Sequence, residues 1–226
     1  MATGGPVLFL HGVPTDGRLW DGVRARLTRP SEAPDLAGFG GAPPLADPTA
    51  RALAEPLLKR LTPQTHLVGH DLGGLVAAQL AALAPVASLT LSSTALGLGW
   101  LPSVLTALPP LNRYFYRRFA GRRWLAMGVG PARREALLAQ YPGAPPEIME
   151  PIARRLPLKG LRPSAPTLCL WGAEDRSFPT LGGRLLARSL GARWEALPGC
   201  RHYAMWEEPG AYAAALEAFW RSVEGS

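Results

Sequence analysis

Gly69-His70-Asp71-Leu72-Gly73-Gly74 joins an apolar run, Thr65–Val68, to a long Ala/Leu-rich stretch, Gly73–Leu83. The run has the length and composition of a buried strand, and the stretch has those of a helix. Small residues on both sides of Asp71 allow a sharp strand-to-helix turn whose central residue has a strained backbone. The segment therefore predicts that the Asp71 side chain stands above a sheet edge at a helix N-terminus, where the helix dipole favours a carboxylate.

Short strands and helices alternate along the rest of the chain. This alternation predicts an α/β fold with a mostly parallel sheet of about six strands and helices on both faces. The other strands are expected at Val7–Leu10, Ala33–Leu36, Val86–Leu91, Pro166–Trp171 and Arg193–Leu197. The other helices are expected at Leu19–Leu27, Thr49–Leu61 (with Pro56 as a site for a kink), Thr180–Leu190 and Gly210–Val223.

Residues 97–162 interrupt this alternation, because they read as helices broken by prolines. We expect a core made of residues 1–96 and 163–226, with 97–162 inserted as a helical lid. The insertion holds ten Arg and one Lys against three Glu, a net charge of +8, while the whole chain carries +7. The basic charge therefore belongs to the lid, where it indicates either a solvated surface or attraction to anionic substrates or membranes.

Composition narrows the class of protein. A chain of 226 residues with 47% hydrophobic residues is long enough for one α/β domain with a sizeable core. It shows no signal peptide, no run of ~20 apolar residues and only two cysteines, so we expect a cytoplasmic protein with free thiols. No metal-ligand spacing and no nucleic-acid motif is present, so we expect no metal, no cofactor and no nucleic-acid partner.

Two further residues stand just beyond predicted strands. Asp175 follows the strand at 166–171, and His202 follows the last strand. Ligands of open α/β sheets bind at the carboxyl ends of the strands, so these side chains are expected near Asp71. The helix that follows Asp71 directs its first N–H groups at the same place, which makes the Leu72 amide a candidate oxyanion donor.

Taken together, these pieces resemble the α/β-hydrolase family over nearly the whole chain. The resemblance rests on the turn at Asp71 and on four other segments: His11-Gly12-Val13-Pro14, Asp35–Gly40, Trp171–Asp175 and the His202 segment. It implies a catalytic triad of Asp71, Asp175 and His202, with a second oxyanion amide from Val13. It also implies that the family's N-terminal strand pair is missing. His11 and His70 are then structural, His66 lies at the surface, and Glu207 and Glu208 are solvated or cap the last helix.

An aspartate in the place of serine changes the expected chemistry. A carboxylate can attack a saturated carbon without losing a proton, which gives an alkyl–enzyme ester that histidine-activated water then hydrolyses. In the family that this chain resembles, an Asp in this place is typical of epoxide hydrolases and of haloalkane or haloacetate dehalogenases. Tyrosines in the lid favour epoxide hydrolysis, so that is the function we expect for this small-molecule hydrolase. Haloalkane or haloacetate dehalogenase, esterase and inactive scaffold remain alternatives.

The substrate-binding candidates come from the lid. Lid tyrosines donate hydrogen bonds to the substrate in epoxide hydrolases, which suggests Tyr114, Tyr116 and Tyr141 as donors and Trp100 as a pocket wall. Leu96–Leu111 is apolar and Arg113–Arg123 is basic and aromatic, so docking of the lid on a membrane surface is a further hypothesis. The sequence leaves the substrate and the oligomeric state open.

Overall fold

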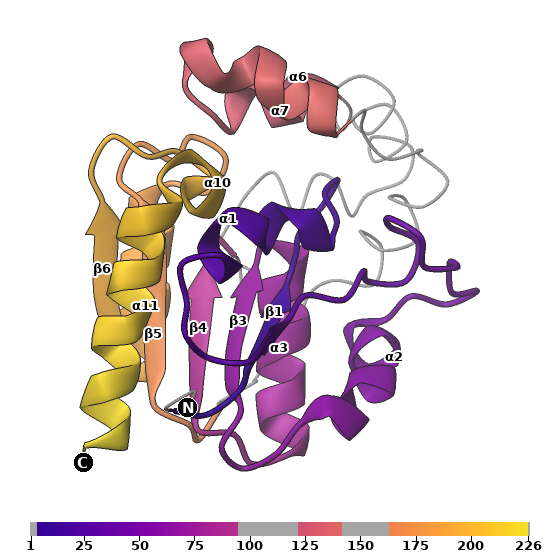
Figure 1. Cartoon of the computed structure of the whole chain (residues 1–226), viewed down its shortest axis with the longest axis vertical. Helices are drawn as coiled ribbons and strands as arrows, with labels where there is room; N and C mark the ends of the chain where they lie inside the picture. The colour runs from indigo at the N-terminus through magenta and orange to yellow at the C-terminus, as the bar shows by residue number, and fades with distance from the viewer. Residues whose placement is uncertain (1–3, 95–121, 142–162, 226) are drawn as a thin grey trace.

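A sheet of six parallel strands lies at the centre of the computed structural model, which describes residues 4–94, 122–141 and 163–225 (Figure 1). The expected six-stranded parallel sheet is confirmed. In spatial order its strands are β2 (Ser31–Glu32), β1 (Val7–Leu10), β3 (His66–His70), β4 (Ser88–Ser92), β5 (Thr167–Gly172) and β6 (Arg193–Leu197).

Helices cover both faces of the sheet, which explains why its four inner strands are buried along their whole length. In β1, Val7 and Phe9 belong to one buried cluster, while Leu8 and Leu10 belong to a second cluster on the opposite face. The first cluster packs against α1 (Asp21–Arg24), α10 (Ala204–Glu207) and α11 (Pro209–Glu224), and the second against α2 (Ala50–Ala54), α3 (Leu72–Leu83) and α9 (Thr180–Leu190).

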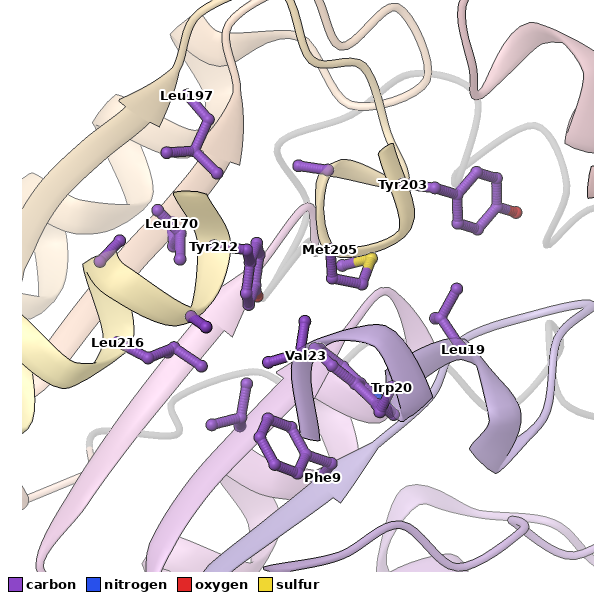
Figure 2. Packing of buried hydrophobic residues seen from close by; sticks show 14 of the residues in the cluster. Phe9, Leu19, Trp20, Val23, Leu170, Leu197, Tyr203, Met205, Tyr212 and Leu216 are labelled. Carbon is purple, nitrogen blue, oxygen red and sulfur yellow. The ribbon is translucent and has the colours of Figure 1, made fainter. Parts of the chain in front are cut away.

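Aromatic side chains hold the last helix against the sheet. The ring centroids of Phe9 and Trp20 lie 4.8 Å apart, and those of Trp20 and Tyr212 lie 5.8 Å apart. Figure 2 shows these three rings, which come from β1, the turn at Gly17–Trp20 and α11, with Val23 and Leu216 in the same cluster. Each such aromatic pair contributes about 0.5–1.5 kcal/mol beyond the area that it buries.

The strand expected at Ala33–Leu36 is wrong, because the observed strand β2 comes earlier, at Ser31–Glu32. Polar groups beyond β2 bond to loops instead of to a neighbouring strand. The Leu36 N–H donates to Nε2 of His11 at 2.9 Å, and the Asp35 carboxylate accepts from the N–H groups of Gly17 and Gly41. These bonds keep residues 33–36 out of the sheet.

The helix boundaries follow local chemistry. The segment expected at Leu19–Leu27 forms a short 3₁₀ turn, η1 (Gly17–Trp20), and the single turn α1. The segment expected at Thr49–Leu61 divides into α2 and η2 (Glu55–Arg60), and the change falls next to Pro56, which has no N–H to donate. The structure confirms the helix expected at Thr180–Leu190 with the same bounds.

The middle of the chain supplies α6 (Arg122–Met127), η3 (Pro131–Arg133) and α7 (Arg134–Gln140). Figure 1 shows α6 and α7 above the carboxyl ends of the strands. The expected boundaries of the lid, 97 and 162, lie outside the described residues, so the division into domains stays a prediction. Within the described ranges, no helix is long and apolar enough to cross a membrane.

His66 is completely buried, so the expectation that it lies at the surface is wrong. Its Nδ1 is 2.8 Å from the Ser88 hydroxyl, and its Nε2 is 3.1 Å from the Glu224 carboxylate. The same carboxylate bonds to the guanidinium of Arg29, which lies over the ring of Trp220. A buried polar group needs such partners, and these contacts tie the start of β3 to the end of α11.

Candidate active site

Asp71 occupies the sharp turn between β3 and α3, with φ 51° and ψ −117°. A non-glycine residue in such a conformation costs on the order of 1–3 kcal/mol of strain energy, which contacts with the surrounding residues must offset. The Thr94 hydroxyl donates to the Asp71 carbonyl at 2.6 Å. A Cβ on Gly69 would lie 2.3 Å from the Gly73 carbonyl oxygen, and a Cβ on Gly73 would lie 2.2 Å from that of Leu10. Only glycine fits at these two positions.

The carboxylate of Asp71 faces the two main-chain amides that the sequence predicts as oxyanion donors. The Val13 N–H donates to Oδ2 at 3.1 Å, and the Leu72 N–H stabilises the same carboxylate. Burial raises the pKa of Asp71 above its ordinary value, although the nearby His202 and these two amides oppose the shift. The two amides can stabilise negative charge on an oxygen attached to Cγ of Asp71.

His202 and Asp175 form a fully buried pair. Nδ1 of His202 lies 3.1 Å from Oδ2 of Asp175, whose Oδ1 accepts from the N–H groups of Ser177 and Phe178. Burial by itself lowers the pKa of His202, but the charge and hydrogen bond of Asp175, together with Asp71, raise it overall. Among the described residues, Nε2 of His202 has no hydrogen-bond partner, so it is available to accept a proton.

The ends of three strands bring these groups together. His70, the neighbour of Asp71 in the turn, has its ring centroid 4.6 Å from that of His202. Burial, and then the proximity of His202, keep the pKa of His70 well below its ordinary value, so its ring is neutral. Asp71, Asp175 and His202 therefore meet at the carboxyl edge of the sheet, as the sequence indicates.

Two aromatic residues of the site escaped the sequence analysis. Phe178 stacks on His202, with ring centroids 5.3 Å apart and an angle of 15° between the planes. Tyr203 packs edge-on against His202, and its hydroxyl donates to the Val13 carbonyl at 3.4 Å. The position of Tyr203 next to His202 is the only signal in the sequence that could have found it, and Phe178 offers none.

Tyr141 is the one substrate-binding candidate within the described residues. Its side chain is buried in the first core cluster, and its hydroxyl accepts a 3.0 Å hydrogen bond from the Gln140 side chain. The Arg18 guanidinium lies over its ring. Contact between Tyr141 and a substrate stays a prediction, and Trp100, Tyr114 and Tyr116 lie outside the described residues.

Other polar groups near the site have structural partners. Nδ1 of His11 lies 2.9 Å from the Gly12 carbonyl oxygen and its Nε2 accepts from the Leu36 N–H, which agrees with the expected structural role. Burial raises the pKa of the Cys200 thiol to about 11, so it is protonated at neutral pH. No group of three metal-ligating side chains occurs among the residues that the structure describes.

The expectation for Glu207 is wrong, because its side chain is buried and does not cap the last helix. One carboxylate oxygen accepts from the Gly130 N–H at 2.8 Å, and the other accepts from the Arg201 N–H at 2.6 Å. Glu208 is half exposed and forms an ion pair with Arg133. Tertiary contacts with a turn 77 residues away explain why local sequence did not predict the burial of Glu207.

The sequence model of the "Alpha/beta hydrolase family" matches residues 7–215. The chain belongs to the α/β-hydrolase family. This α/β-hydrolase is therefore a hydrolase by family, with the triad-like arrangement of Asp71, Asp175 and His202 at the edge of the sheet where the family fold places its reaction centre.

Curated relatives of this α/β-hydrolase include esterases. It is 32% identical to the pimeloyl-[acyl-carrier protein] methyl ester esterase of Methylococcus capsulatus in an alignment of 212 positions that covers 82% of each chain. It is 28% identical to the biotin biosynthesis bifunctional protein BioHC of Cellvibrio japonicus over 96% of this chain. That match covers 48% of the relative, so the chain spans about half the length of that protein.

Solved structures confirm the fold. A thermophilic esterase from Thermogutta terrifontis superposes with a TM-score of 0.83 at 24% identity, over 99% of this chain and 92% of the other. The haloalkane dehalogenase DbeA from Bradyrhizobium elkani superposes with a TM-score of 0.75 at 19% identity, over 100% and 92%. The same architecture thus occurs in proteins that cleave different bonds.

Proposed function

We propose that this α/β-hydrolase acts by covalent catalysis, with Asp71 as the nucleophile and His202 as the base. The observation that carries the proposal is the hydrogen bond from the Val13 N–H to Oδ2 of Asp71. It places the nucleophile's own oxygen against the amides that stabilise an oxyanion. An oxyanion bonded to Cγ of Asp71 forms when water attacks an ester of Asp71, and the site is arranged for that step.

In the first step, Oδ1 of Asp71 attacks a saturated carbon of the substrate. The bond between that carbon and its leaving group breaks, and the leaving group departs with the electron pair. The product is an alkyl ester of Asp71. A carboxylate needs no base for this attack, which agrees with the absence of a hydroxyl nucleophile at residue 71.

In the second step, Nε2 of His202 takes a proton from water, and the resulting hydroxide adds to Cγ of Asp71. The negative charge forms on Oδ2, where the amides of Val13 and Leu72 stabilise it. The intermediate then expels the substrate alkoxide, which takes the proton from His202 and becomes the alcohol, and the Asp71 carboxylic acid that remains releases its proton to regenerate the carboxylate. Asp175 holds the imidazole in the required tautomer and stabilises its protonated form.

Hydrolysis of a carboxylic ester is a second candidate, which the relatives favour over epoxide opening. The relative from Methylococcus capsulatus, 32% identical, is a methyl ester esterase, and neither relative described above is an epoxide hydrolase. In this alternative Asp71 and His202 activate water for direct attack on the substrate carbonyl. The amides of Val13 and Leu72 would then have to bind the substrate oxygen, so the Asp71 carboxylate would have to leave them.

A single-turnover reaction in ¹⁸O-water separates the two candidates. The enzyme, in excess, is mixed with alkyl halides, epoxides or methyl esters, and products and digested protein are analysed by mass spectrometry. Covalent catalysis places ¹⁸O in the Asp71 carboxylate and ¹⁶O in the alcohol. Direct attack of water on an ester places ¹⁸O in the product acid and leaves Asp71 unlabelled, which would contradict the proposed nucleophile.

A further inference from the structure

The turn Gly128–Gly130 contacts the loop that carries His202. The Tyr203 N–H donates to the Gly128 carbonyl at 3.2 Å, and the Arg201 side chain donates to the Val129 carbonyl at 3.0 Å. A Cβ on Gly128 would lie 2.4 Å from the Tyr203 ring, so this close approach needs glycine. The turn connects α6 to η3 and α7, which Figure 1 shows above the carboxyl ends of the strands.

Glu207 joins the turn and the loop with one buried carboxylate. Its Oε1 accepts from the Gly130 N–H at 2.8 Å, and its Oε2 accepts from the Arg201 N–H at 2.6 Å. The residue is only 6% exposed. Hydrogen bonds to an ionised carboxylate are shorter and about twice as strong as those between neutral groups. Arg201 directly precedes His202, so this contact acts on the backbone that orients the imidazole.

We propose that Glu207 is a positioning residue that couples the place of the α6–α7 segment to the orientation of His202. The inference rests on the proposed function, because it assigns Glu207 to the step in which His202 activates water. Attack by Asp71 needs no base, so the formation of the alkyl ester does not depend on Glu207. Glu207 then holds the α6–α7 segment, which covers the strand ends, and His202, the base that starts hydrolysis, in one relative arrangement.

Substitution of Glu207 by glutamine tests the coupling at nearly constant shape. A glutamine side chain has one oxygen that accepts hydrogen bonds and an NH₂ group that only donates them, so it can accept from only one of the two amides. One of the two main-chain N–H groups therefore loses its partner. Glu208→Gln is the matched control, because Glu208 bonds to Arg133 of the same segment but to no amide of the histidine loop. Glu207→Asp keeps both oxygens on a shorter side chain.

The experiment compares these variants with the wild type and with His202→Gln. The substrate is one that forms an alkyl adduct on Asp71 of His202→Gln. Intact-mass spectrometry follows the alkyl ester, and hydrogen exchange follows residues 128–130 and 200–203. In Glu207→Gln we expect hydrolysis of the ester to slow by about 10- to 100-fold with ester formation within about twofold of wild type. Both peptides should exchange faster, Glu207→Asp should be intermediate, and Glu208→Gln should match the wild type.

Different results separate the inference from the proposed function. Failure of His202→Gln to give an adduct with any substrate would contradict the covalent mechanism itself. An adduct in His202→Gln, combined with equal slowing of both steps or unchanged hydrogen exchange in Glu207→Gln, would overturn only the role of Glu207. If Glu207→Gln yields no folded protein, the same two readouts on Glu207→Asp decide the question.

Discussion

A hydrogen bond of 3.1 Å joins the Val13 N–H to the carboxylate of Asp71, although the two residues are 58 positions apart in the chain. Gly12 makes this approach possible, since a Cβ there would lie 2.5 Å from the Cβ of Asp71 and 2.9 Å from its Oδ2. The loop after β1 and the turn after β3 therefore form one structure. In it, an amide that commonly binds a substrate oxygen binds the candidate nucleophile instead.

Substitution of Asp71 by asparagine should abolish covalent catalysis, because the amide keeps the size of the side chain but is a poor nucleophile. Loss of a nucleophile that acts with its base costs on the order of 10⁴- to 10⁶-fold in kcat. The measurement is turnover together with intact mass, which should show no adduct. Asp21→Asn, an exposed ion-pair residue on α1, is the control and should retain activity. Wild-type turnover in Asp71→Asn would move the assignment to another residue.

Substitution of Asp175 by asparagine should act on the second step. The amide cannot stabilise a protonated imidazole, and it allows the wrong tautomer at His202. Turnover should fall by about 10³- to 10⁴-fold while the alkyl ester of Asp71 accumulates. Rapid-quench mass spectrometry resolves the two steps. A variant that forms no ester at all would show that Asp175 supports the site in another way.

The pH dependence of kcat should have an acid limb set by the protonation of His202. His202 must be neutral to take a proton from water. In the free enzyme burial lowers its pKa, but the charge and hydrogen bond of Asp175, together with Asp71, raise it overall above 6.5, and the contacts with Asp175 persist when Asp71 is esterified. Turnover therefore falls as the pH drops through the raised pKa. In His202→Gln only ester formation is observed, so its rate should lack this limb and follow the ionisation of Asp71, whose pKa burial raises above 3.8 in the wild type. An identical profile in both proteins would contradict the assignment of the base.

The contacts of Glu224 with the buried side chains of Arg29 and His66 should make stability depend on pH far from the active site. Hydrogen bonds from Arg29, together with those from His66 and Gly5, hold the pKa of Glu224 at about 2, against an ordinary value of 4.5. A lowered folded-state pKa gives stability that is present above 4.5 and lost as the pH falls towards 2. Glu224→Gln should lower Tm at pH 7 and flatten its fall between these values. Glu55→Gln, which removes a surface ion pair, should change Tm little.

Substitution of Gly73 by alanine should destabilise the protein by about 1–3 kcal/mol through overpacking. The new methyl group would lie 2.2 Å from the carbonyl oxygen of Leu10 and 2.5 Å from that of His11, and neither is a movable side chain. Gly182→Ala in α9 is the control, because a Cβ there meets nothing within 4 Å and alanine favours helix by about 0.5–1 kcal/mol. Chemical denaturation of both variants measures the two opposite effects.

The sequence alone determined the fold and the main candidate residues, because both depend on short-range patterns. Apolar runs separated by helical stretches specify a parallel sheet, and the glycines around Asp71 specify a sharp turn. Asp175 and His202 could be predicted since parallel strands end at one edge, which gathers residues that follow different strands. The structure places all three at that edge.

Tertiary packing alone decided which polar groups are buried and what they bond to. Local sequence gave no sign that His66 would contact Glu224, 158 residues away, or that Glu207 would join Gly130 to Arg201. It also misplaced β2, because the amide of Leu36 bonds to His11, 25 residues earlier. Sequence patterns report which face of an element is apolar, whereas the partner of a buried polar atom depends on segments brought together only when the chain folds.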